Sequence, residues 1–245
     1  MTATLEHNRQ QLAARIDDAA HAAGRAAEDL CVVAITKYVE VPTVLALARL
    51  GQHDLGENRA EELEAKAQAL HAANVTVRWH FVGHLQRNKA RRVAMIADVI
   101  HSVDTPRLIQ SLDRIADQEG RRLEVFLEVR LTDEATKHGF LPEDLCEGVE
   151  ALRGAKHLHP LGIMGMSPAS GDSDAAAAAF RHLRSLADEL ERDPSTAQIF
   201  VGGRVRTSMG MSGDFREAIA AGADYLRIGS SFFEGIDHTV REVPA

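Results

Sequence analysis

The sequence has few of the residues from which several common kinds of site are built. Its 245 residues include two cysteines, one tryptophan and two tyrosines, and aromatic residues make up only 4%. Cys31 lies in an apolar run, Cys146 lies in a helical stretch, and neither belongs to a CxxC pair. The sequence therefore predicts neither a metal centre nor a disulfide framework.

Long hydrophobic runs and basic segments are also missing. No apolar run approaches the ~20 residues of a membrane span, and residues 1–18 lack the apolar stretch of a secretion signal. With 28 basic and 36 acidic residues the net charge is −8, which makes nucleic acid an unfavourable partner. We expect a soluble, cytoplasmic protein with no membrane association, whose acidity serves mainly solubility.

The hydrophobic residues that are present, 45% of the chain, follow a regular order. An amphipathic helix over about residues 5–23 opens the chain, and short apolar runs then alternate with helical stretches. Strands are predicted at Leu30–Ile35, His53–Gly56, Arg78–Val82, Val99–Val103, Leu123–Val129, His159–Ile163, Arg206–Met209 and Tyr225–Ile228. Helices are predicted at Pro42–Leu50, Arg59–Ala73, Asn88–Ala97, Pro106–Glu119, Pro142–Leu152, Ala175–Arg192 and Phe215–Ala221.

This alternation indicates the α/β class with a parallel sheet. Eight strand–helix units in 245 residues favour a closed (β/α)8 barrel, a TIM barrel with an extra N-terminal helix, over an open doubly wound sheet. No linker rich in proline, glycine or serine divides the chain, so residues 1–245 are predicted to form one domain. The active site of such a barrel forms at the carboxyl ends of the strands.

Lys37 follows the first predicted strand directly after Thr36. A lysine at the end of a buried run is partly desolvated, and desolvation lowers the pKa of an amine and makes it a better nucleophile toward an aldehyde. The alternative is a strand-end lysine whose stem lies on apolar surface while its ammonium group reaches water. The position alone leaves both interpretations open.

Three further strand ends carry candidate ligand-binding residues. Asn58 follows the second strand and either faces a ligand or caps the helix that starts at Arg59. His80 alternates with Phe81, so one of the two points into the barrel, as a site residue or as a core histidine. Met164 flanks Gly165 after the sixth strand, where it can line an aromatic ring or simply fill the core.

The seventh and eighth units carry the most informative pattern. Ser208–Asp214 and Arg227–Ser231 each end a strand and open a helix with small and hydroxyl residues. Barrels of this class often bind phosphate with these two loops, although serine-capped turns would look the same. Arg227 inside the barrel mouth needs a partner, either a ligand atom or a carboxylate such as that of Glu57 or Asp214. Two ligand classes fit: a phosphorylated aldehyde cofactor, or a sugar phosphate processed by a lysine Schiff base.

Five motifs in order resemble those of the pyridoxal phosphate (PLP) homeostasis protein family, from about Leu30 to Gly235. They are AITK ending at Lys37, GEN ending at Asn58, WHFVG with LQRNK over 79–89, MGMS with Asp214 over 209–214, and RIG over 227–229. Three positions depart from the family pattern: Ser230 replaces threonine, His84 replaces a frequent proline, and Tyr38 follows the lysine.

The resemblance implies the barrel of the amino-terminal domain of alanine racemase, with PLP held by Lys37 as an internal aldimine. It places Asn58 near the cofactor ring, Met211 and Ser212 at the phosphate end, and Arg227 at the pyridine nitrogen. The residues expected around the cofactor are Lys37, Asn58, His80, Met164, Met211, Ser212, Arg227, Gly229 and Ser230.

The implied function is buffering or delivery of PLP inside the cell, without strong catalysis. The alternative is a PLP-dependent amino-acid racemase or a related fold type III enzyme, which needs a second acid/base group, commonly a tyrosine. Tyr38 adjoins the lysine and is expected to point away from it, Tyr225 begins the eighth strand at the other end of the barrel, and the sequence stops at Ala245. We therefore expect no efficient racemase and no second domain. A Schiff-base aldolase is a third reading, but no acid/base pair accompanies the lysine.

Two aspects of cofactor release stay open at this point. Lys137 in the 132–139 loop can contact the ligand during release, or it can be a solvated surface lysine. PLP-dependent apoenzymes are the partners that a delivery role would require, and the sequence names no particular one.

Overall fold

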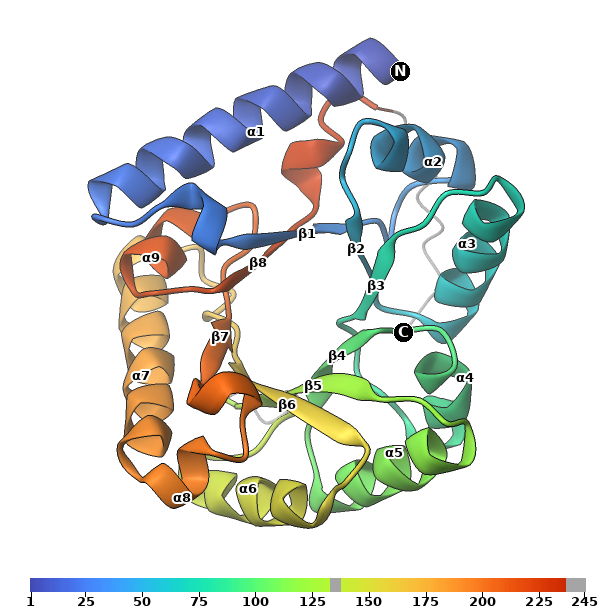
Figure 1. Cartoon of the computed structure of the whole chain (residues 1–245). Helices are drawn as coiled ribbons and strands as arrows, with labels where there is room; N and C mark the ends of the chain where they lie inside the picture. The colour runs from blue at the N-terminus through green and yellow to red at the C-terminus, as the bar shows by residue number, and fades with distance from the viewer. Residues whose placement is uncertain (133–137, 237–245) are drawn as a thin grey trace.

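Eight parallel strands close into a barrel in the order of the sequence, from β1 to β8, with β8 pairing back onto β1. This computed structural model describes residues 1–132 and 138–236 (Figure 1). The strands are β1 Cys31–Ile35, β2 Asp54–Glu57, β3 Arg78–Phe81, β4 Val99–Val103, β5 Leu123–Glu128, β6 Leu158–Met164, β7 Arg206–Ser208 and β8 Tyr225–Ile228. The predicted (β/α)8 barrel is confirmed.

Helices surround the barrel, and the N-terminal helix α1 packs beside α2, α9 and the short turn η5 (Figure 1). The α-helices are α1 Thr2–Ala22, α2 Val41–Arg49, α3 Ala60–Ala72, α4 Ala90–Ala94, α5 Pro106–Gln118, α6 Leu145–Gly154, α7 Ser173–Arg192, α8 Pro194–Ala197 and α9 Phe215–Ala220. Single 3₁₀ turns are η1 Ala27–Asp29, η2 Arg87–Lys89, η3 Pro142–Asp144, η4 Val201–Gly203 and η5 Ser230–Phe232. None of the helices in the described ranges is long and apolar enough to cross a membrane.

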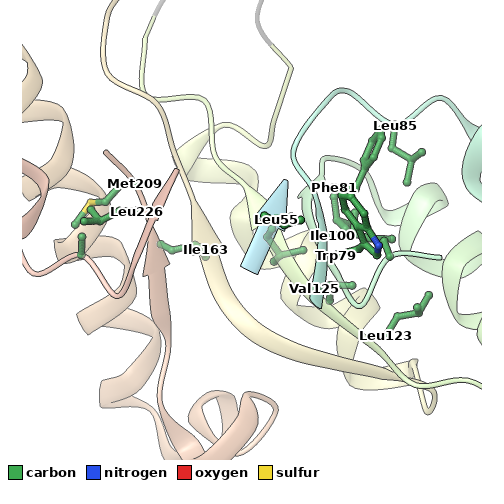
Figure 2. Packing of buried hydrophobic residues seen from close by; sticks show 14 of the residues in the cluster. Leu55, Trp79, Phe81, Leu85, Ile100, Leu123, Val125, Ile163, Met209 and Leu226 are labelled. Atoms are coloured by element: carbon green, nitrogen blue, oxygen red, sulfur yellow. The ribbon is translucent and has the colours of Figure 1, made fainter. Parts of the chain in front are cut away.

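The strand period of two separates an outer core from an inner layer. Trp79 and Phe81 lie together on the outer side of β3, near Leu85, in the core between sheet and helices (Figure 2). His80 between them points into the barrel, where its side chain is fully buried. A second, inner cluster is formed by Val33, Ile35, Val99, Phe126, Leu161, Met164 and Tyr225. Polar side chains therefore occur inside the barrel next to apolar ones.

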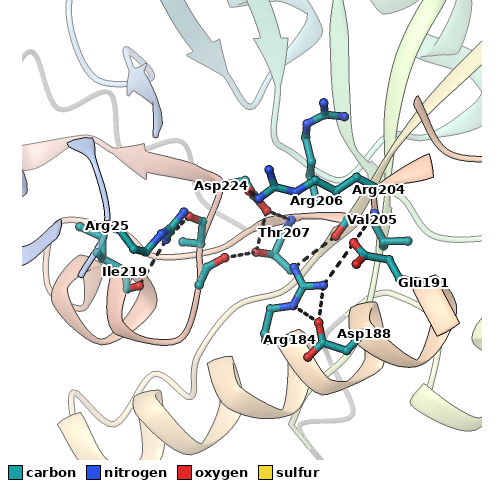
Figure 3. A network of polar contacts seen from close by, with 12 residues as sticks. Arg25, Arg184, Asp188, Glu191, Arg204, Val205, Arg206, Thr207, Ile219 and Asp224 are labelled. Carbon is teal, nitrogen blue, oxygen red and sulfur yellow. Dashed lines mark hydrogen bonds and ion pairs between the residues drawn. The ribbon is translucent and has the colours of Figure 1, made fainter. Parts of the chain in front are cut away.

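A polar network secures the beginnings of β7 and β8 at the end of the barrel opposite the strand carboxyl termini (Figure 3). The Asp224 carboxylate accepts a hydrogen bond from the Thr207 N–H at 2.8 Å and pairs with Arg204. Arg25, from the segment after α1, donates to the Ala223 carbonyl at 2.6 Å. These contacts set the positions of the two strands whose other ends enter the candidate site.

Candidate functional site

A cavity of about 580 Å³ opens at the carboxyl ends of the strands. Seven of the nine residues expected from the sequence line it, and they come from the ends of four different strands. Its lining consists of Ile35, Lys37, Tyr38, Asn58, Val82, Gly83, Met166, Met211, Ser212, Gly213, Arg227, Gly229, Ser230 and Phe233. The order of the strands thus collects residues that are up to about 200 positions apart in the sequence, as a parallel barrel should.

Lys37 reaches this cavity from the end of β1, but it is exposed rather than partly buried as the sequence suggested. Its Nζ lies 4.7 Å from the centroid of the Tyr38 ring, a cation–π contact. The prediction that Tyr38 points away from the lysine is therefore wrong. The backbone turns after Thr36, whose carbonyl accepts hydrogen bonds from the Val39 N–H and from Lys66 Nζ. Both side chains that follow, Lys37 and Tyr38, then line the cavity.

The strand end before Lys37 is held by a buried ion pair that the sequence did not reveal. Lys66 Nζ lies 2.6 Å from the Glu57 carboxylate and 2.9 Å from the Thr36 carbonyl oxygen, to which it donates. The Thr36 hydroxyl donates to the same carboxylate oxygen of Glu57. Glu57 is thus a structural partner of Lys66 and not of Arg227. Lys66 occupies a helix rich in alanine and glutamate, where a lysine normally indicates a solvated face.

Asn58 lines the cavity and does not cap a helix. Helix α3 begins one residue later than predicted, with Arg59 at its N-cap position and no side-chain capping bond. The backbone around Asn58 is packed tightly against Gly83, because a Cβ at Gly83 would lie 2.0 Å from the Asn58 carbonyl oxygen. Gly83 is therefore needed for the close approach of the β2 and β3 loops that positions Asn58.

Backbone N–H groups converge at the end of the cavity formed after β7 and β8. The N–H groups of Gly229 and Ser231 both point at the Ser212 hydroxyl oxygen, at 3.2 Å and 3.4 Å. Successive N–H groups turned toward one point form an anion-binding concavity. Asp214 shapes the loop instead of pairing with Arg227, since it accepts bonds from the Met211 N–H and the Ser167 hydroxyl.

Arg227 lines the cavity although it is buried, and it bonds to neutral oxygens. Its Nη1 donates to the Ser208 hydroxyl at 2.8 Å and its Nη2 to the Gly165 carbonyl at 3.1 Å. Burial lowers the pKa of Arg227 to about 10, against the opposing influence of the Glu128 and Asp214 carboxylates. The guanidinium group therefore remains charged at neutral pH, and neither Glu57 nor Asp214 is bonded to it.

A hydrogen-bonded chain runs from Arg227 through the barrel interior. Ser208 Oγ lies 2.8 Å from His101 Nδ1, His101 Nε2 lies 2.9 Å from His80 Nδ1, and His80 Nε2 lies 2.9 Å from Asp54. The Asp54 carboxylate can only accept, so a neutral His80 donates to it from Nε2 and accepts at Nδ1 from His101 Nε2, and His101 Nδ1 then accepts from the Ser208 hydroxyl. Both histidines are then neutral, which agrees with the lowering of their pKa by burial.

Two residues expected at the cofactor do not line the cavity. His80 belongs to the chain that ends at Asp54, one layer deeper in the barrel. Met164 is buried in the inner apolar cluster, and the residue that faces the cavity from this strand end is Met166. The alternation of side chains along a strand shows which residues point into the barrel, but not how far along the barrel axis they lie. The sequence therefore could not distinguish residues that line the cavity from those in the layer below it. Lys137 lies outside the described residues.

Glu128, at the end of β5, is a buried acid near both Arg227 and Asp104. Burial, with a smaller contribution from Asp104, raises its pKa from 4.5 to about 7. Between these values the folded protein keeps a proton that the unfolded chain releases, so stability falls as pH rises through this window. The loss amounts to at most about 3 kcal/mol.

We expect Glu128→Gln to remove this pH dependence. The variant should match the wild type near pH 4.5, where Glu128 is neutral, and exceed it at about pH 8 by up to ~3 kcal/mol in free energy of unfolding. Urea denaturation at a series of pH values measures the difference, with the exposed Glu150→Gln as the control. A difference that does not change with pH would contradict the raised pKa.

Comparison with known proteins places this chain in a family. A family model described as the N-terminal domain of alanine racemase matches residues 4–236. A pyridoxal phosphate homeostasis protein of Pseudomonas aeruginosa is 34% identical over 235 residues, which cover 96% of this chain and 97% of the relative. The chain belongs to the pyridoxal phosphate homeostasis protein family. A further member, from Synechocystis, is 34% identical and covers 82% of this chain and 89% of its own.

Solved structures agree with this membership. PipY of Synechococcus elongatus, in a structure with PLP bound, superposes with a TM-score of 0.75 at 31% identity, covering 84% of this chain and 92% of PipY. An alanine racemase of Clostridium difficile has a TM-score of 0.69 at 14% identity, and the match covers 94% of this chain but 55% of the racemase. At that identity the racemase shares the fold alone.

Proposed function

We propose that this protein binds PLP in the cavity and buffers or delivers it within the cell, as a homeostasis protein and not as an efficient enzyme. The observation that carries the proposal is the presence, in one cavity, of three features suited to this molecule. They are the amine of Lys37, the charged donor Arg227 and the converging N–H groups of Gly229 and Ser231.

The cavity fits a phosphorylated aldehyde in size and in charge. Its volume of about 580 Å³ lies within the ~300–1,000 Å³ usual for small-molecule sites. Lys37 and Arg227 are cations, and none of the described residues that line the cavity is a carboxylate. The lining therefore attracts an anionic phosphate compound, while Ile35, Val82 and Phe233 supply apolar surface for an aromatic ring.

Each polar residue has a distinct part in holding the ligand. PLP supplies, when bound, an electrophilic aldehyde carbon that can bond reversibly to an amine. Lys37 would provide that amine, Arg227 a hydrogen bond to the ring nitrogen, and the Gly229–Ser231 backbone with Ser212 the phosphate contacts. Because Arg227 is held by Ser208 and stays protonated, it leaves the ring nitrogen without a proton. That arrangement disfavours the carbanion chemistry of most PLP enzymes.

The lining also supports binding rather than racemisation. A two-base racemase needs its second acid/base group across the substrate from the lysine, whereas Tyr38 lies directly against Lys37. Among the described lining residues no histidine, cysteine or carboxylate could replace it. We expect alanine and serine racemisation well below the ~1 s⁻¹ of ordinary enzymes, measured by chiral chromatography. Turnover at that rate or above would favour the racemase instead.

A negative charge introduced at the phosphate end should weaken the binding of PLP more than the binding of a ligand without a phosphate. Ser230→Asp places a carboxylate beside the converging N–H groups, where it competes with the phosphate and repels it. We expect PLP affinity to fall at least about tenfold, equivalent to ~1.4 kcal/mol, as followed by equilibrium titration in absorbance or fluorescence.

Pyridoxal, which lacks the phosphate, provides the matched control. Its weaker binding should be almost unchanged in Ser230→Asp, and Ser230→Ala should affect both ligands little because the contact there is mainly backbone. Equal losses for PLP and pyridoxal would argue against a phosphate site at this end. Failure of the wild type to bind PLP at all would overturn the proposed function.

Delivery to PLP-dependent apoenzymes and a cytoplasmic location are part of the same proposal. An exposed lysine at an open cavity mouth supports transfer, because the attached ligand stays within reach of a partner. A role of Lys137 in release stays a prediction. Mixing the loaded protein with a PLP-dependent apoenzyme, and following the appearance of that enzyme's activity, tests the delivery step.

A further inference from the structure

A second group of ligand-type side chains lies beside the cavity mouth. His84, Asp104 and His138 follow β3, β4 and β5, and one ligand atom from each lies within 4.8 Å of the other two. His84 Nδ1 is 3.3 Å from the Asp104 carboxylate. The His84 and His138 rings are stacked, with centroids 3.6 Å apart and an angle of 10° between planes.

The structure around these residues positions them firmly. His84 stands between Gly83, pressed against Asn58, and the buried Leu85. Asp104 follows the fully buried end of β4 directly and precedes Thr105, the N-cap of α5, whose hydroxyl accepts from the Leu108 N–H.

His138 is positioned by the chain that returns to β5. Phe140 pairs with Val129 as an isolated bridge, and its N–H donates to the Glu128 carbonyl at 2.8 Å. Gly139 adopts a φ of +116°, and a Cβ there would lie 2.9 Å from the Arg130 nitrogen. This close approach brings His138 back over the mouth of the barrel, against His84.

We propose that His84, Asp104 and His138 form a binding site for Zn²⁺ or a divalent transition-metal ion of similar softness. Two imidazoles and a carboxylate are a ligand set that such ions prefer, and three protein ligands leave a position open for water or a small ligand. Two donor atoms about 3.3 Å apart match an edge of a tetrahedron with ~2.0–2.1 Å metal bonds. The proposal is independent of the proposed PLP function.

The charges around the group favour a cation. The nearly parallel, stacked rings direct their nitrogen lone pairs into separate planes, so one of the two rings must turn out of the stack for both to bind the same ion. Asp104 is largely buried, and the Glu128 carboxylate lies close enough to interact with it electrostatically. A bound cation would offset the negative charge of Asp104.

A comparison with another donor group in the barrel sharpens the assignment. Cys31, Asp54 and His80 also bring three ligand atoms within 4.8 Å of one another. There, however, Arg78 lies 3.6 Å from the Asp54 carboxylate, and His80 is already bonded to that carboxylate and to His101. A guanidinium group at this distance opposes a second cation, so we assign the metal site to the His84 group alone.

Competition titration with a chromophoric chelator tests the assignment on the full-length protein freed of metal. We expect one equivalent of Zn²⁺ to bind, and His84→Ala and His138→Ala each to weaken it at least about 100-fold, since loss of a supporting group alone costs 10–100-fold. Asp104→Asn should weaken it as well. Co²⁺ should give tetrahedral visible absorption in the wild type but not in the two histidine variants, and excess Mg²⁺ should not compete.

Two controls keep the result interpretable. Cys31→Ser and His182→Ala, an exposed histidine of α7, should bind Zn²⁺ as the wild type does. Circular dichroism melts without metal show whether each variant is folded, and either histidine variant suffices if the other unfolds. Unchanged affinity in a folded His84→Ala or His138→Ala variant, loss of binding in Cys31→Ser, or no binding at millimolar Zn²⁺ would overturn the proposal.

Discussion

Lys37→Ala is expected to give a folded protein that carries no pyridoxyl group after incubation with PLP and reduction with borohydride. Lys37 is the one lysine among the described residues that line the cavity. Its side chain is exposed, so its removal should change the free energy of unfolding by no more than about 0.5 kcal/mol. The loss of attachment should therefore be complete without loss of the fold.

Mass spectrometry of the reduced protein measures this outcome and locates the modified residue. Lys37→Arg is a more specific test than Lys37→Ala, because it keeps the positive charge beside Tyr38 but offers no amine that can bond to the aldehyde. Lys156→Ala, at an exposed position outside the cavity, should be modified at Lys37 as the wild type is. If Lys37→Ala carried a pyridoxyl group on another residue at the yield of the wild type, the assignment of Lys37 as the attachment site would be wrong.

The phosphate contacts should survive this substitution. Because Gly229, Ser231 and Ser212 are independent of Lys37, the alanine variant should still bind PLP reversibly and more weakly than the wild type. Dialysis would then remove the ligand from the variant but not from the wild type. This difference separates a tether role of the lysine from a role in shaping the cavity.

Lys66→Ala should be the most destabilising substitution near the site, with a loss of about 3–5 kcal/mol in the free energy of unfolding. Glu57 is fully buried, and its second carboxylate oxygen has no hydrogen-bond partner, so Lys66 neutralises a charge that water cannot reach. Removing the lysine also removes one of the two hydrogen bonds that the Thr36 carbonyl, immediately before Lys37, accepts. Attachment of PLP should therefore become slower or incomplete.

A double variant distinguishes an uncompensated charge from lost packing. Glu57→Gln/Lys66→Met removes both charges and keeps the side-chain volumes, so it should recover most of the stability lost in Lys66→Ala. Glu62→Ala removes the half-exposed second partner of Lys66, 3.8 Å away, and should cost no more than ~1 kcal/mol. Urea denaturation provides all three values. A loss below about 1 kcal/mol in Lys66→Ala would show that the pair is not a critical contact.

Much of the fold could be predicted because its signals are local. Apolar runs of four to seven residues between amphipathic helices define each unit, and the observed β4 and β8 have the predicted bounds. Helix ends were less predictable, since the stretch expected at 88–97 divides into a 3₁₀ turn and a short α-helix at Ala90–Ala94. Its last turn tightens where Ile96 and Ala97 both bond to the Val93 carbonyl.

The cavity lining was predictable where a residue lies within a few positions of a strand end, as for Lys37, Asn58 and Ser212. It was not predictable where a residue's place depends on its depth in the barrel or on the direction of its side chain. His80 and Met164 alternate correctly into the barrel but lie below the cavity, and Tyr38 turns toward Lys37 because the chain bends after Thr36. His101 could have been noticed, because it alternates on β4 as His80 does on β3.

The sequence by itself determined the barrel, the strand ends that line the cavity and the family, because each depends on periodicity and on the order of short motifs along the chain. Only the tertiary structure decided which partners those residues have: Lys66 for Glu57, Ser208 for Arg227, and His138 for His84. These pairs join positions between 9 and 54 residues apart. Burial and distance between remote side chains arise only when the barrel closes, so no local pattern could record them.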